Sequence, residues 1–287
     1  MRLQRGIALV QILLFVAIFS AIMLYFSKTA KEQIEIAQLV QDRALAELNI
    51  HSASQKLYFE LLIEDNGFSP YDPQHRKNYF GKAFEVFDDV EVKLFDLSSR
   101  LDLRYPNQDN LKALLVYGGL NEEDAGALVR DLLDYQDVDK IGRLSFDENK
   151  VTQFGNRNGP LSDIGELRLF ELPKEMLELL IDNTSIFKTG SFNPLNASAE
   201  LLTALYGQQT ANEVIALREQ TNISKQEFLM RTRIKETEDV FVFTGTSFEI
   251  HFSSKVNDIK LNKQVTLQVK PYSQADQSPL NILEIRQ

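Results

Sequence analysis

The stretch IALVQILLFVAIFSAIMLYF, residues 7–26, decides how this chain is organised. It has no charged side chain over about 20 residues, the length at which a helix crosses the ~30 Å hydrocarbon layer of a bilayer. Arg2 and Arg5 precede it, and the positive-inside tendency places that short end in the cytoplasm and the long remainder outside. A cleaved secretory signal is the alternative, but its apolar part usually spans roughly 7–15 residues and ends at a small-residue cleavage site.

A helical pattern continues beyond the apolar run. Ile34, Ala37, Val40 and Leu48 recur at helical spacing, and neither glycine nor proline interrupts the pattern before residue 63. A helix over residues 7–63 would be roughly 85 Å long at 1.5 Å per residue. The sequence therefore predicts one long helix, half of it in a membrane and half packed on a globular head.

Alternating apolar residues predict strands on both sides of a middle region. Val90, Val92 and Leu94 alternate within residues 86–103, and four further alternating runs lie near the far end of the chain. Those runs are residues 239–243, 247–252, 258–261 and 264–269, with a hairpin predicted around Asn262 and Lys263. We expect the strands of both groups to form one antiparallel sheet against the long helix.

The middle of the chain has the pattern of short helices. They are predicted at residues 110–117, 121–135, 165–170, 173–181, 197–206, 211–220 and 225–231. Asn121, Ser162 and Ser224 are predicted N-caps, because their side chains can accept hydrogen bonds from the first free amides of a helix. The sequence thus predicts an α+β fold in which a helical domain is inserted between strands.

Composition argues against several classes of function. The 287 residues have a net charge of -10, which disfavours a nucleic-acid partner, and the chain has no cysteine, so it has no disulfide or thiolate metal site. The three histidines, His51, His75 and His251, lack the spacing of a zinc site or a catalytic triad. No nucleophile motif or phosphate-binding loop is found, and we predict no enzymatic activity.

The first residues carry a resemblance to a known family. Met1-Arg2-Leu3-Gln4-Arg5-Gly6, followed by the apolar run, is similar to the class III leader of type IV pilins and type II secretion pseudopilins. The resemblance implies cleavage after Gly6 by a prepilin peptidase and N-methylation of Ile7. Most pilins have glutamate at the fifth mature position, where this chain has Gln11. A subunit with no neighbour above it would not need a carboxylate at this position. The alternative is that Gln11 is simply a polar residue tolerated near the membrane.

Four later segments resemble the K-class minor pseudopilin of type II secretion. They are DLSSRLDL (residues 96–103), DLLDYQDVD (131–139), NGPLSDIGELR (158–168) and FNPLNASAELL (192–202). The order of the segments matches that family along nearly the whole chain. Ser99 in place of glycine, Tyr135 in place of tryptophan and the Pro194-Leu195 pair are departures that indicate a divergent member.

The resemblance implies a pilin-like α+β fold with a long transmembrane helix on an antiparallel sheet and a large all-helical, SAM-like domain inserted between strands. The predicted divisions are a leader (1–6), a transmembrane helix (7–26), a helix extension with the first strands (27–106), the inserted domain (107–238) and C-terminal strands (239–287). A DNA-binding helix-hairpin-helix unit is the alternative for the insert. Its turns lack a basic cluster, so we interpret the shape as one that packs on protein.

An acidic segment after residue 136 is a candidate calcium loop. Asp137 and Asp139 fit the first and third positions of such a loop, Gly142 fits the sixth, and Glu148 fits the twelfth. Ile141 occupies the fifth position, where an oxygen ligand is expected. Calcium binding in K-class relatives, which the resemblance implies, favours calcium as a cofactor, and an acidic solvated segment is the alternative.

The leading functional prediction is a minor pseudopilin that starts or caps the periplasmic pseudopilus of a type II secretion system. The resemblance implies as partners the I-class and J-class minor pseudopilins, the major pseudopilin, the prepilin peptidase and the inner-membrane secretion platform. It also implies a single-pass protein of the bacterial inner membrane with its soluble domain in the periplasm. A minor pilin of a type IV pilus is the second hypothesis, and a membrane-tethered periplasmic hydrolase is the third.

Overall fold

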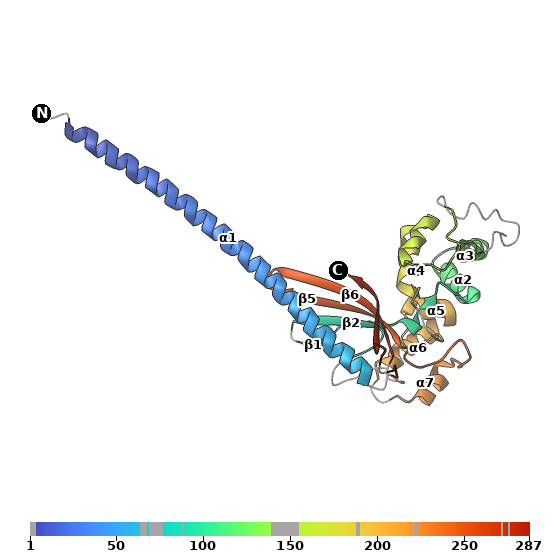
Figure 1. Cartoon of the computed structure of the whole chain (residues 1–287). Helices are drawn as coiled ribbons and strands as arrows, with labels where there is room; N and C mark the ends of the chain where they lie inside the picture. Colours follow the sequence, from blue (N-terminus) through green and yellow to red (C-terminus); the bar gives the residue numbers. More distant parts are fainter. Residues whose placement is uncertain are drawn as a thin grey trace.

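One helix of 60 residues, α1 (Gln4–Ile63), dominates the shape of the molecule (Figure 1). The computed structural model describes residues 4–63, 68, 77–87, 89–138, 155–187, 190–220, 223–270, 272–274 and 276–287. The N-terminal part of α1 extends away from the head, whereas its C-terminal part lies along a sheet (Figure 1). The predicted long helix over residues 7–63 is confirmed.

Within the described residues, the sheet that α1 covers has five antiparallel strands. Its order is β1-β2-β5-β6-β7. The strands are β1 (Phe84–Phe87), β2 (Val90–Asp96), β5 (Ser247–Val256), β6 (Ile259–Val269) and β7 (Leu280–Arg286). Strands from before and after the middle region therefore pair in one sheet, with β2 beside β5, as the alternation predicted.

One face of the sheet is apolar and packs on α1. Val92 and Leu94 of β2 and Phe252 of β5 are buried there against Leu57 and Leu61 of α1. This group of buried residues, together with its neighbours from β1 and β6, is called the sheet core below. The period-two pattern of the strands places the intervening polar residues on the opposite face, away from α1.

A helical unit occupies the chain between β2 and β5. Its helices are η1 (Leu97–Ser99), α2 (Gln108–Tyr117), α3 (Glu122–Gln136), η4 (Ile164–Phe170), α4 (Lys174–Asn183), α5 (Ala199–Tyr206), α6 (Gln208–Arg218) and α7 (Lys225–Thr232). Two short strands, β3 (Leu101–Asp102) and β4 (Thr184–Ser185), pair in parallel within it. Buried residues such as Leu114, Leu201 and Phe228 form its own hydrophobic core, called the helical core below.

The predicted fold class is confirmed: a long apolar N-terminal helix packs on an antiparallel sheet, with several helices between the strands. The exact divisions of the chain, at residues 106–107 and 238–239, stay a prediction. Asn121 and Ser224 cap α3 and α7 as expected. Asp163 caps η4 in place of Ser162, in a reciprocal capping box with Glu166.

Two local predictions are wrong. The hairpin between β5 and β6 turns at Asn257, which has a positive φ of 50°, and β6 runs straight through Asn262 and Lys263. Residues 239–243 form only an isolated bridge, between Val240 and Phe192, because these residues close the helical unit and do not extend the sheet.

Candidate assembly site

The N-terminal part of α1 has no covering partner within the described chain. Every side chain from residue 9 to residue 26 is exposed, although nearly all are apolar. The helix is long and apolar enough to cross a membrane, and water disfavours an apolar surface of this size. The arrangement is compatible with a single membrane anchor.

A charged spacer joins this apolar part of α1 to the head. Lys28 lies 3.9 Å from Glu32, and Arg43 lies 3.2 Å from Glu47, each pair one helical turn apart. Such exposed pairs add only a few tenths of a kcal/mol each, but they keep the helix surface solvated. Leu39 and Val40 are also exposed on this spacer, so another molecule could pack here. From residue 9 onward, the first fully buried residue of α1 is Ala46.

The structure leaves the predicted processing site untested. Gly6 and Ile7 belong to the first turns of α1, and Met1 to Leu3 lie outside the described residues. Cleavage after Gly6 and methylation of Ile7 therefore stay predictions. Gln11 is exposed on the apolar part of the helix.

The sheet and the helical unit meet at a buried carboxylate. Asp96 is the last residue of β2 and is 0% exposed. Its side chain accepts hydrogen bonds from the Ser98 amide at 2.9 Å, from Nδ2 of Asn193 at 3.1 Å and from Nδ2 of Asn196 at 3.1 Å. Burial raises the pKa of Asp96, although these hydrogen bonds act against the rise.

Gly245 allows this polar junction to close. Its amide nitrogen lies 3.3 Å from the Asp96 carboxylate, at the point where the chain returns from the helical unit into β5. A Cβ atom at Gly245 would lie 2.9 Å from Cβ of Ser98 and 3.0 Å from Oδ1 of Asp96. A larger residue would therefore push the two parts of the molecule apart. The chain leaves the sheet and returns to it at this one junction.

An ion pair reinforces the junction from the other face of the sheet. Arg100 donates two hydrogen bonds of 3.0 Å to Glu249 of β5, and His251 lies 2.8 Å from the same carboxylate. Burial acts to raise the pKa of Glu249, but the hydrogen bond with His251 and the charge of Arg100 bring it down to about 2. The bidentate geometry fixes the direction in which the chain leaves β2.

A second polar cluster lies inside the helical unit. Glu166 accepts hydrogen bonds from Tyr135 at 3.0 Å, from Arg157 at 2.9 Å and from the Ser162 amide at 3.0 Å. Burial acts to raise the pKa of Glu166, but the hydrogen bonds from Ser162 and Tyr135 lower it below its usual value. This cluster joins the segments at residues 131–139 and 158–168.

The four family-like segments thus meet in two polar clusters. Asp96 joins the first segment to Asn193 and Asn196 of the fourth, and Glu166 joins the third segment to Tyr135 of the second. Sequence reasoning did not assign these contacts. One signal was available, because Asp96 falls on the apolar face of its strand, in phase with Val92 and Leu94. An acid at such a position needs buried hydrogen-bond donors.

The predicted calcium loop lies mostly outside the described residues. Asp137 is the C-cap residue of α3, whereas Asp139 and Glu148 are not among the described residues. No group of three or more metal-ligating side chains occurs in the described part of the chain. The three ligands and calcium itself therefore stay predictions.

Comparison with solved structures gives a similarity in fold. No family model and no curated protein matches the sequence. A chain of the crystal structure "GspK-GspI-GspJ complex from enterotoxigenic Escherichia coli Type 2 Secretion System" is similar in fold, with a TM-score of 0.59 and 17% sequence identity. The match covers 90% of this chain and 98% of that chain. At this identity the similarity concerns the fold alone, and the chain has a pseudopilin-like fold.

Proposed function

We propose that this chain is a minor pseudopilin of a type II secretion system and that it starts or caps the tip of the periplasmic pseudopilus. The observation that carries the proposal is the position of the helical unit. It lies at the end of the head remote from the N-terminus of α1 (Figure 1). With α1 anchored in the membrane, the helical unit is then the part farthest from it.

A tip position follows from the geometry of a repeating filament. Subunits that stack by their N-terminal helices need the same surface free at every step. The helical unit adds bulk at the end where the next subunit would stand, and a terminal subunit has no such limit. Gln11, in place of the usual glutamate, fits a subunit with no neighbour above it.

The exposed part of α1 supplies the surface for assembly. The apolar run through Phe26 would lie in the inner membrane, and the spacer with Leu39 and Val40 would pack against neighbouring subunits. The expected neighbours are the I-class and J-class minor pseudopilins, with the major pseudopilin below them. Processing after Gly6 and methylation of Ile7 would precede assembly, and no catalytic role is proposed.

Calcium is proposed as a ligand of the helical unit, held by Asp137, Asp139 and Glu148. Carboxylate oxygens at this spacing are the ligands that calcium prefers. Asp137 is positioned at the end of α3, where the chain leaves the helix. The ion would then tie the following loop to the helical core.

Localisation of the subunit in isolated pseudopili tests the proposal. We expect antibody label or cryo-microscopy density for the helical unit at one end of the filament, and co-purification of two other minor pseudopilins. Regular repetition of the subunit along the shaft would refute the tip position. Co-purification with the components of a type IV pilus would favour the minor-pilin alternative.

A further inference from the structure

The face of the sheet opposite α1 carries several basic side chains on an otherwise acidic protein, together with the acids Glu91, Glu249 and Glu284. Its exposed basic residues are Lys93 of β2, Lys255 of β5, Lys260 of β6 and Arg286 of β7, with His251 of β5 among them. The face they form is called the outer sheet face below. A cavity of about 340 Å³ lies on it, and Glu91 is the only acidic residue that lines this cavity in the described part of the chain.

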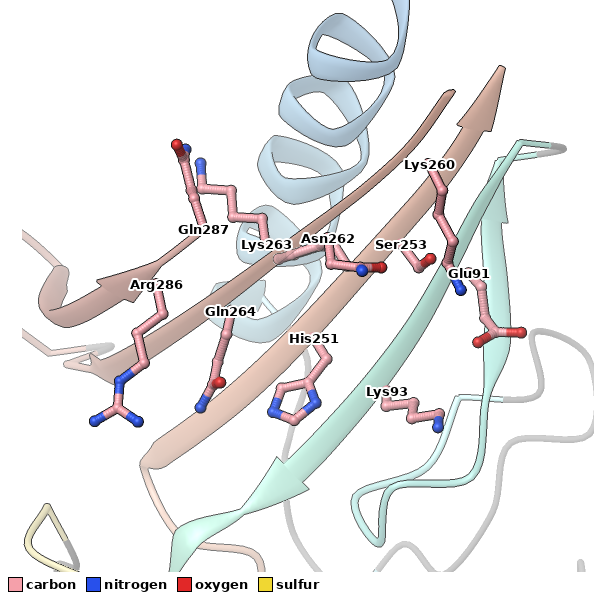
Figure 2. Close-up of a pocket in the computed structure, with 11 residues that line it drawn as sticks. Glu91, Lys93, His251, Ser253, Lys260, Asn262, Lys263, Gln264, Arg286 and Gln287 are labelled. Carbon is pink, nitrogen blue, oxygen red and sulfur yellow. The ribbon is translucent and has the colours of Figure 1, made fainter. Parts of the chain in front are cut away.

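Four of the polar side chains form one row across the strands. The register pairs Lys93 with His251, His251 with Gln264, and Gln264 with Arg286. Figure 2 shows all four pointing away from α1, in order across the sheet. With strands spaced about 4.8 Å apart, the two charged ends of the row are roughly 14 Å from each other.

Two lysines at the end of the hairpin face each other, and among the described residues neither forms an ion pair. Lys255 and Lys260 are directly opposite in the register of β5 and β6. Like charges in this position destabilise a sheet. Within the described residues, Lys93, Lys255 and Lys260 have no acidic side chain at ion-pair distance, whereas Arg286 pairs with Glu284. The arrangement costs stability and leaves three cations free for an external anion.

The length of α1 excludes anionic lipid as that partner. Asn257, in the turn beside Lys255, donates a hydrogen bond of 3.0 Å to Asp42 of α1. The turn therefore stands about 24 Å along the helix beyond Phe26, where the apolar run ends. Charges on a membrane surface are screened within about 8 Å at physiological salt, so the outer sheet face lies beyond their reach.

We propose that the outer sheet face binds an extended acidic segment of a partner protein. In an extended chain, residues four apart point to the same side at about 13 Å spacing, which matches the span from Lys93 to Arg286. Two acidic residues four apart would contact Lys93 and Arg286. The uncharged residue midway between these two acids would lie over His251 and Gln264. A nucleic acid, with a charge every ~3.4 Å of each strand, would not match this spacing. Such binding does not depend on where the subunit stands in a filament.

The test uses the full chain in nonionic detergent and a fluorescent peptide, acetyl-Ser-Glu-Thr-Ser-Thr-Glu-Ser-amide. We expect saturable binding that weakens at least about tenfold when Lys93→Glu and Arg286→Glu are combined, because the two exposed charge pairs at the ends of the row are lost and repulsion is added. The matched control is Lys235→Glu, an exposed lysine of the helical unit. A peptide with glutamine in place of both glutamates should also bind about tenfold more weakly.

The proposal is overturned if the glutamate and glutamine peptides bind equally, or if the double variant binds like the Lys235→Glu control. It is also overturned if the peptide does not bind while a sulfated oligosaccharide binds through Lys93 and Arg286, which would assign the face to glycans. Thermal melting checks that each variant is folded. The milder pair Lys93→Gln and Arg286→Gln serves if the reversals unfold the sheet.

Discussion

The sheet core and the helical core differ in where their residues come from. The sheet core combines α1, β1 and β2 with β5 and β6, so it draws on both sides of the helical unit. The buried residues of the helical core all come from the continuous stretch from Leu101 to Val242, and Phe68 also packs against them. The sheet therefore depends on contacts between the two sides of the helical unit, whereas the helical unit is built almost entirely from contacts within one continuous stretch of chain. The difference suggests two units with separate stabilities, coupled through the junction at Asp96.

The largest expected effect comes from a cavity in the sheet core. Leu57 of α1 is 0% exposed, and Leu57→Ala should lower the stability of the sheet by about 4 kcal/mol. Hydrogen exchange measured by mass spectrometry on the full chain should show faster exchange in β2, β5 and β6, with little change in the helical unit. Leu48→Ala, at an exposed position of the same helix, is the control. Equal loss of protection in both units would show that they unfold as one.

The next effect concerns the junction itself. Asp96→Ala should cost about 3 kcal/mol, because the amides of Asn193 and Asn196 and the Ser98 backbone would lose their buried acceptor. Here both units should lose hydrogen-exchange protection. Asp96→Asn should cost less, since it keeps one acceptor oxygen. If Asp96→Ala affects the sheet alone, the junction does not couple the two units.

Low pH should weaken the junction between the sheet and the helical unit, because it protonates Glu249. Its pKa is lowered to about 2 in the folded protein, so its stabilising contribution is fully present above pH ~4.5 and is lost as the pH falls toward 2. We expect the difference in unfolding free energy between wild type and Glu249→Gln to shrink by about 3 kcal/mol over that range. Denaturant unfolding at several pH values measures it. When both proteins also carry Arg100→Gln, this pH-dependent decrease in the free-energy difference should be smaller. An unchanged decrease would mean that Arg100 does not stabilise the Glu249 carboxylate.

Calcium should stabilise the helical unit rather than the sheet. If it binds the segment that begins at Asp137, free calcium at a hundred times its dissociation constant would add about 2.7 kcal/mol to the helical unit. Calorimetry with calcium and with a chelator tests this, and Asp137→Ala with Glu148→Ala should abolish the shift. If millimolar calcium does not change the melting temperature, the segment is merely acidic and does not bind calcium. A shift that survives both substitutions would place the ion elsewhere.

The smallest effect is expected in the exposed part of α1. Gln11→Glu should change the stability of neither unit, because the side chain contacts neither core. Assembly into pseudopili should also change little if the subunit stands at the tip. The number of filaments in cells with the wild-type protein is compared with the number in cells with Gln11→Glu. A strong gain or loss of filaments would argue against the tip position.

The sequence predicted the local features of the fold well. The run without glycine or proline predicted α1, and the alternation of Val90, Val92 and Leu94 predicted a half-buried strand. The hairpin was misplaced because Asn257-Asp258 and Asn262-Lys263 are both plausible turns, and only the long register of β5 with β6 selects the first. The contacts of Asp96 with Asn193 and Asn196 join residues about a hundred positions apart. Local pattern contains no information about which distant donors will reach a buried acid.

The junction has a consequence for the order of folding. Arg100 and Glu249 are 149 residues apart in sequence, and closing a flexible loop of that length costs about 4 kcal/mol of chain entropy. Once the helical unit has folded, its two ends meet beside Asp96, where the Gly245 amide approaches the carboxylate. The loop that β2 and β5 must close then shrinks to a few residues. A chain that emerges unfolded on the far side of a membrane could thus complete its sheet quickly, because the inserted helices have already brought the two strands together.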